Sequence, residues 1–190
     1  MMKQIRYIRL LLSRNDDGTT AIEFAMLSPV MLLFILGIIE FSLIMFTQTV
    51  MESATNTTAR LGKTGAVDGS GLSREEQLIE NVATRTAGLL DRENIQVSMT
   101  TYSTFNNVNR PEPFIDANGN GFYNTGETYT DINGNGQWDE DMGSAGAGQA
   151  NDIVVYTVSY PWPIMTPIVS SILGNSFPLT ARTVVKNEPW

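Results

Sequence analysis

The stretch FAMLSPVMLLFILGIIEFSLIMF, residues 24–46, decides the fold of this chain. Glu40 is the only charged side chain between Phe24 and Phe46. A helix rises about 1.5 Å per residue, so this one is about 34 Å long, enough to cross a hydrocarbon core of about 30 Å. A buried helix of a soluble protein is the alternative, but a core built from this chain is too small to enclose an apolar helix on every side. We therefore expect a single membrane span at about 24–46.

Positive charge is distributed unequally around this span. The flank after the span has no Lys or Arg before Arg60, whereas the flank before it has four, at Lys3, Arg6, Arg9 and Arg14. The positive-inside rule therefore predicts a cytoplasmic N-terminus and an extracytoplasmic C-terminal domain. A cleaved secretory signal peptide is the alternative, but its apolar stretch would be about 7–15 residues long and would precede small residues at a cleavage site. The stretch here is longer, and TQTV at 47–50 offers no such site.

The helix is expected to continue beyond the span. Apolar positions recur with a spacing of three and four residues, which is the pattern of one buried helix face. The residues of this face are Val50, Met51, Ala54, Thr58 and Leu61. Gly62 and Gly65 then end the helix. We predict one helix over about 19–61, half in the membrane and half an amphipathic stalk, with a kink or local unwinding at Pro29.

The remaining residues, 62–190, are predicted to form one small extracytoplasmic domain. LSREEQLIENVATRTAGLL, from 72 to 90, has a helical apolar face, and Ser73 followed by Glu76 is a candidate capping box. Three stretches have the alternation of antiparallel strands: NIQVSMTTYSTF at 94–105, DIVVYTVSYPW at 152–162 and FPLTARTVVKN at 177–187. A short helix, IVSSIL, is expected between the last two. The fold class is therefore α+β, with a long N-terminal transmembrane and stalk helix, a second helix and a small antiparallel sheet.

The composition argues against an enzyme. The chain has no cysteine and no histidine, so it cannot form a thiolate zinc site, a thiol nucleophile or an imidazole base. A Ser-x-x-Lys spacing is also absent from the sequence. Nucleic-acid binding is disfavoured as well, because basic residues do not cluster beyond the first 14 positions.

An acidic insert, residues 111–142, contains seven Asp or Glu residues and no Lys or Arg. It includes two copies of Asp-x-Asn-Gly-Asn-Gly, which begin at Asp116 and Asp131. The first copy fits the twelve-residue calcium loop, with Gly121 at the sharp turn. Its candidate ligands are Asp116, Asn118, Asn120, the Phe122 carbonyl and Glu127. The second copy offers Asp131, Asn133, Asn135 and the Gln137 carbonyl, but its twelfth residue is Met142, so Asp139 or Asp141 would have to substitute.

Calcium is the cation that this insert is expected to bind, as one or two ions. Oxygen ligands suit hard cations, and seven carboxylates without a cation would repel one another. Helical patterns do not flank the loops. The insert instead resembles the tandem D-x-N-G-N-G-x-Y/W-D calcium repeats of extracytoplasmic proteins, with Tyr123 and Trp138 at matching places. A pair of Asn-Gly hairpin turns without metal is the alternative.

The residues before the span carry a resemblance to a known family. Gly18 followed by TTAIEF resembles the processing site of type IV pilin precursors. The longer block GTTAIEFAMLSPVMLLFILGIIEFSLIMFTQTVMESATNTTARLG, residues 18–62, resembles the opening of TadE-like proteins, minor pilins of the Tad (Flp) pilus machinery. The stretch from 152 to 189 resembles the C-terminal region of that family more weakly.

The resemblance implies a minor pilin or pseudopilin of the bacterial inner membrane, with a pilin-like fold. A prepilin peptidase would remove a cytoplasmic leader, residues 1–18, by cutting between Gly18 and Thr19. The protein would then assemble, prime or cap a Tad pilus used in adhesion. Its expected partners are other pilins or pseudopilins through the N-terminal helix, the prepilin peptidase and the Tad inner-membrane assembly platform.

The resemblance also gives roles to three residues of the first helix. Glu23 takes the fifth mature position, where the acid of pilins meets the α-amino group of a neighbouring subunit, and Phe24 takes the sixth. Alternatively, Glu23 is an interfacial residue among the headgroups. Glu40, an acid deep in the span, is expected to pair with another subunit or a machinery component, or to lie at the outer interface. An unprocessed, membrane-anchored calcium-binding adhesion or receptor module is the alternative function.

Overall fold

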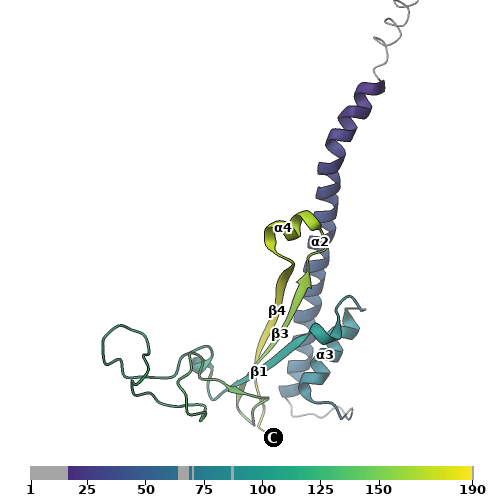
Figure 1. Ribbon diagram of the computed structural model, residues 1–190. Coiled ribbons are helices and arrows are strands. Elements are labelled where there is room, and N and C mark those ends of the chain that lie inside the picture. The colour runs from purple at the N-terminus through teal and green to yellow at the C-terminus, as the bar shows by residue number, and fades with distance from the viewer. Residues whose placement is uncertain (1–16, 64–68, 70, 87, 190) are drawn as a thin grey trace, which may run out of the picture. The chain divides into compact units, whose positions relative to one another are not determined.

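The structure is a computed structural model that describes residues 17–63, 69, 71–86 and 88–189. The helices are α2 (Asp17–Lys63), α3 (Arg74–Arg85) and α4 (Pro167–Leu173), with short 3₁₀ turns η1 (Arg92–Asn94) and η2 (Phe105–Asn107). The strands are β1 (Gln96–Tyr102), β2 (Ser144–Ala145), β3 (Ile153–Pro163) and β4 (Ser176–Lys186). Figure 1 shows them in order of colour along the chain.

The chain divides into two compact units. The first unit holds the chain through Leu43 together with the segment Ile164–Asn175, and the second holds Ile44–Pro163 together with the chain from Ser176 onward. Helix α4 therefore belongs to the same unit as the first part of α2. The predicted leader, residues 1–18, lies almost entirely outside the described residues.

Helix α2 confirms the prediction of one long N-terminal helix. It runs for 47 residues and stays helical through Pro29, so it does not unwind there. Its most apolar window of 18 residues has a mean hydropathy of 2.5, and only 11% of that window is buried. By length and composition it is able to cross a membrane.

The sheet has four strands in the order β2-β1-β3-β4, all antiparallel. Strand β3 pairs with β4 along its whole length, from Ile153↔Lys186 to Pro163↔Ser176. Strand β1 pairs with the first half of β3. The three predicted strands are thus confirmed. Strand β2 was not predicted, because two residues are too few to show an alternation.

The second unit has a core on both faces of β3. Tyr156, Val158 and Trp162 are at most 1% exposed, as are Met51 and Ala54 of α2. A hydrogen bond of 2.9 Å from Gln48 Nε2 to the Thr180 carbonyl joins α2 to β4. The opposite face is covered by a smaller cluster of Tyr102, Met142, Ile153 and Val155. Both faces are therefore buried where β3 begins.

Helix α3 begins as the sequence predicts but ends earlier. Ser73 and Glu76 form a complete capping box, and the main-chain and side-chain hydrogen bonds from Ser73 lower the pKa of Glu76. The expected helix ran to residue 90, whereas α3 ends at Arg85. Gly88 adopts a φ of +78°, a left-handed conformation that turns the chain out of the helix.

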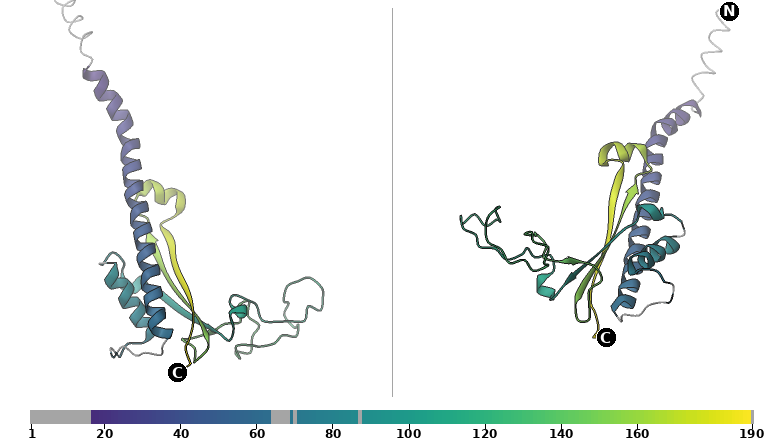
Figure 2. Two further views of the ribbon diagram at one scale, coloured as in Figure 1. Left: turned by 180° about the vertical axis from the view of Figure 1, so that it is seen from behind. Right: turned by 60° about the horizontal axis from the view of Figure 1, so that its bottom comes forward.

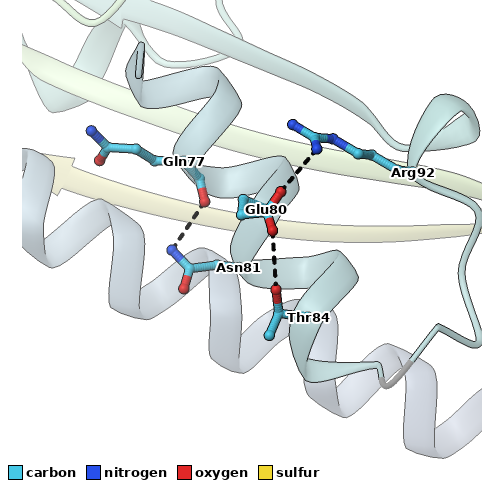
Figure 3. Close-up of polar contacts among 5 residues, drawn as sticks. All are labelled: Gln77, Glu80, Asn81, Thr84 and Arg92. Atoms are coloured by element: carbon cyan, nitrogen blue, oxygen red, sulfur yellow. Dashed lines mark hydrogen bonds and ion pairs between the residues drawn. The ribbon is translucent and has the colours of Figure 1, made fainter. Parts of the chain in front are cut away.

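Polar contacts run along α3 and join it to the turn that follows (Figure 3). Glu80 accepts a hydrogen bond from Thr84 Oγ1 at 3.4 Å and pairs with Arg92 at 3.0 Å. Asn81 Nδ2 donates to the Gln77 carbonyl at 3.0 Å. It also donates to Thr58 Oγ1 of α2 at 3.2 Å. The Asn81 amide thus links the two helices within the second unit.

Candidate functional site

The residues of the candidate processing site lie on the first turns of α2. Gly18, Thr19, Glu23 and Phe24 are all exposed, and Phe24 is 65% exposed. A Cβ atom added to Gly18 would meet nothing within 4 Å. The structure therefore places these four residues close together along one accessible end of the helix. The leader residues 1–16 that would precede the cut lie outside the described residues.

Large apolar side chains are exposed along α2 between residues 22 and 46. They are Ile22, Phe24, Met26, Leu27, Val30, Met31, Leu32, Phe34, Ile35, Leu36, Ile38, Ile39, Phe41, Met45 and Phe46. A soluble monomer rarely exposes a continuous apolar surface of this extent. A lipid environment removes these side chains from water, so the exposure agrees with a single-pass membrane protein.

Glu40 has partners within its own chain. It is only 6% exposed. Its Oε1 accepts a hydrogen bond of 2.6 Å from the Met165 amide, and its Oε2 accepts one of 3.3 Å from the Thr166 amide. Both amides precede α4 in the first unit. The sequence alone did not reveal them, because they lie 125 and 126 residues away.

The acidic insert forms irregular loops that project from the sheet of the second unit (Figure 1). In the first loop, Asp116 Oδ1 accepts the Gly119 amide at 2.7 Å and Oδ2 accepts the Gly121 amide at 2.8 Å. Main-chain hydrogen bonds, that from Gly121 foremost, lower the pKa of Asp116. The Asn118 and Asn120 side-chain amides both donate to Asn124 Oδ1.

The second loop repeats this network at the equivalent residues. Asp131 accepts the Gly134 amide at 2.6 Å and the Gly136 amide at 2.8 Å. The side-chain amides of Asn133 and Asn135 both donate to Asp139 Oδ2, at 2.7 and 2.6 Å. Asp139 therefore stands where Asn124 stands in the first loop.

Each loop is closed by a glutamate, but only the first loop contains its own. Glu127 closes the first loop: its carboxylate accepts the Ala117 amide at 3.0 Å and the Asn124 amide at 2.9 Å. In the second loop, Glu112 accepts the amides of Ile132 and Asp139, the equivalent residues, at 2.6 and 3.2 Å. Glu112 is fully buried. Sequence reasoning missed it, although Glu112 precedes Glu127 by the same interval that separates Asp116 from Asp131.

A small aromatic cluster and a backbone pairing hold the two loops together. Phe114 and Tyr129 form an antiparallel bridge, flanked by hydrogen bonds of 2.8 Å from Ile115 to Thr128 and from Thr130 to Pro113. The Tyr123 and Trp138 rings stack with their centroids 4.5 Å apart. Residues 112–126 and 127–141 are thus two copies of one paired motif.

The other acids and Met142 have different surroundings. Asp141 Oδ2 accepts the Tyr102 hydroxyl at 2.7 Å, and Asp141 Oδ1 accepts the Gly143 amide at 3.3 Å. Burial, and then this hydrogen bond, raises the pKa of Tyr102 to about 12. Met142 packs in the core cluster with Tyr102. Asp141 is therefore engaged away from the second loop, and Glu112 takes the place that Met142 cannot fill.

The donor set of each loop fits a hard cation. Each loop supplies one Asp, two Asn and a ninth-position Asn or Asp, and a Glu lies beside each: Glu127 of the first loop itself, and Glu112 from outside the second. These groups carry the oxygen atoms that calcium prefers. Across the part of the chain that the structure describes, no three acidic side chains gather closely enough to form a metal site by themselves. A cation would therefore depend on amide and main-chain oxygens in addition to the carboxylates.

Comparison with known proteins bears on the first helix. Residues 18–60 match the model of a family described as TadE-like protein. The matched residues lie within α2. The match links the chain to proteins associated with the Tad pilus, a family that is structural rather than catalytic. Searches of curated proteins and of solved structures find no match to the chain.

Proposed function

We propose that the protein is a minor pilin or pseudopilin that takes part in the assembly, priming or tip structure of a Tad pilus. The observation that supports this most directly is the TadE-like match over residues 18–60, which covers the candidate processing site and the apolar helix together. In this proposal the N-terminus is cytoplasmic, the C-terminal domain is extracytoplasmic, and a prepilin peptidase cuts between Gly18 and Thr19.

Glu23 has a defined role in this proposal. Cleavage leaves a free α-amino group on Thr19, and the Glu23 carboxylate of one subunit pairs with that group on a neighbouring subunit. An ion pair in a low-dielectric setting fixes the register of two helices even where its net stabilisation is small. The exposed Phe24 and the apolar residues that follow it supply the helix surface that packs against other pilins.

Processing is tested with the Gly18→Ala variant of the full chain. Thr19→Ala, which changes the adjacent residue on the other side of the bond, is the matched control. We expect N-terminal sequencing of the membrane-extracted wild-type and control proteins to begin at residue 19, and that of Gly18→Ala to retain the leader. A wild-type protein that keeps residues before Thr19 would instead favour an unprocessed, membrane-anchored adhesion or receptor module.

We further propose that the acidic insert binds one or two calcium ions. The observation that favours it is that Glu112 contacts the second loop at the residues equivalent to those that Glu127 contacts in the first, so that both loops have an equivalent set of oxygen groups. Loops of this kind in extracellular modules bind calcium with dissociation constants of about 0.1–1 mM. Such an affinity suits a domain outside the cytoplasm.

Calorimetric titration of the full chain in detergent tests the calcium proposal. We expect Glu112→Gln to weaken calcium binding by the second loop, although Glu112 lies outside the sequence of that loop. We expect Glu127→Gln to weaken calcium binding by the first loop. Glu140→Gln is the control, because Glu140 is an exposed acid of the same insert. A wild-type titration that shows no heat of binding at millimolar calcium would contradict the proposal. If Glu140→Gln lowered the calcium affinity as much as the other two variants, the binding would reflect the net negative charge of the insert and not the two loops, which would also contradict the proposal.

A further inference from the structure

The segment between β3 and β4, Ile164–Asn175, is called the tip here. It belongs to the first unit together with the apolar part of α2, and the views of Figures 1 and 2 agree in placing α4 beside that helix. A hydrogen bond of 3.0 Å from the Ile164 amide to the Asn175 carbonyl closes the base of the tip. The tip is thus a closed loop lying against the helix that is expected to cross the membrane.

Glu40 fixes the level at which the tip meets α2. Its carboxylate accepts the amides of Met165 and Thr166 at 2.6 and 3.3 Å. Glu40 lies six residues before Phe46, the end of the apolar stretch, and six residues of helix rise about 9 Å. If α2 spans a membrane, the contact therefore lies about 9 Å inside the span, on the side of the C-terminal domain.

The tip has the composition of a membrane-contacting segment. From Ile153 to Ala181 the chain has no Asp, Glu, Lys or Arg. Within the tip, Met165 is 58% exposed and Ile168 is 52% exposed. A charge-free segment with exposed apolar side chains suits the outer part of the acyl region, which is the level that Glu40 gives it.

We propose that the tip inserts into the leaflet on the side of the C-terminal domain and gives the protein a second membrane contact beside α2. Lipid is the occupant that the position favours, because the neighbouring α2 residues Ile39 and Phe41 are exposed at the same level, 52% and 63% respectively. The same arrangement explains how an acid is tolerated at position 40 of an apolar helix. The tip covers the Glu40 carboxylate, so the carboxylate is not exposed to lipid.

The proposal is tested by quenching of a fluorophore in vesicles. The chain has no cysteine, so Ile168→Cys and Met165→Cys each accept one environment-sensitive dye in the full-length protein. The labelled proteins are reconstituted into phosphatidylcholine and phosphatidylglycerol vesicles that contain lipids with a nitroxide on a shallow or a deep acyl carbon. Ile35→Cys marks the span, and Thr104→Cys marks an exposed position of the second unit.

We expect the dyes at 165 and 168 to be quenched at least twofold more by the shallow nitroxide than by the deep one, and the dye at 104 by neither. Quenching at 165 and 168 no greater than at 104 would overturn the proposal. A second copy of the chain is the other possible cover for the tip. It would be indicated by a dye whose emission reports burial from water but which the lipids do not quench, or whose emission shifts to that of a water-exposed dye when the protein is diluted tenfold in lipid. Either result would also overturn the proposal. If the dye at 35 were not quenched, the assignment of α2 as a membrane span would be wrong, and the proposal for the tip would be wrong with it. Quenching at 35 without quenching at 165 and 168 would overturn only the proposal for the tip.

Discussion

At the scale of single residues, the contact between Glu40 and the tip is the clearest example of a long-range role. A carboxylate that accepts two main-chain N–H groups is engaged within its own chain. In the free protein Glu40 therefore has no need of a partner on another subunit. The predicted part of Glu40 in assembly stays a prediction, and it would require this contact to open or to be shared.

Glu40→Gln should loosen the tip. Glutamine offers one acceptor oxygen instead of two, so one of the two amides loses its hydrogen bond, and a hydrogen bond to a charged group contributes about 1.5–3 kcal/mol. We expect the amides of Met165 and Thr166 to exchange hydrogen about tenfold faster or more in nanodiscs. Glu52→Gln, which changes an exposed acid of the same helix, should leave them unchanged. Unaltered exchange in Glu40→Gln would show that this contact does not hold the tip.

Glu112 shows what sequence reading misses at the same scale. The twelve-residue template places every ligand within one loop, whereas Glu112 reaches the second loop because two loops pair. The equal spacing of the two glutamates and of the two repeats was visible in the sequence. The pairing was not, because it depends on contacts between segments rather than on either segment alone.

At the scale of the elements, periodicity predicted most of the fold. Helix α2, the start of α3, and strands β1, β3 and β4 follow from apolar spacing and from the Ser73–Glu76 box, which are local signals. The end of α3 and the two-residue β2 were missed. The first depends on the left-handed turn at Gly88, and the second on pairing with Thr100 and Thr101 of β1.

Gly62 sets the distance between the end of α2 and β3. A Cβ atom on Gly62 would overlap the hydroxyl of Tyr156, which is fully buried and makes no hydrogen bond within the described part of the chain. We expect Gly62→Ala to lower the free energy of unfolding by about 1–2 kcal/mol, because overpacking costs about 1–3 kcal/mol and the gain in helix propensity offsets up to about 1 kcal/mol. Chemical denaturation in detergent measures the change.

Two further variants separate overpacking from other effects. Gly37→Ala is the matched control, because nothing lies within 4 Å of the added Cβ. Tyr156→Phe removes the overlapping atom, so the double variant with Gly62→Ala should recover most of the lost stability. A Gly62→Ala protein as stable as the wild type would contradict the close packing of α2 on β3.

At the scale of the whole molecule, the apolar and the acidic residues are concentrated in different segments of the chain. The first unit combines the apolar helix with the uncharged tip. Of the net charge of −8, nearly all arises from the acidic insert, which has seven acids and no base. The apolar helix, the packed sheet and the acidic insert are thus built from different segments. The TadE-like match covers residues of α2 alone.

The central claim, that the chain is a processed pilin, is tested most directly by intact-mass spectrometry of the protein in filaments sheared from the cell surface. A chain that begins at Thr19, with residues 1–18 absent, is the result that we predict. A chain in the filament fraction that still carries the residues before Thr19, or a complete absence of the protein from that fraction while it stays in the membrane, would contradict the account.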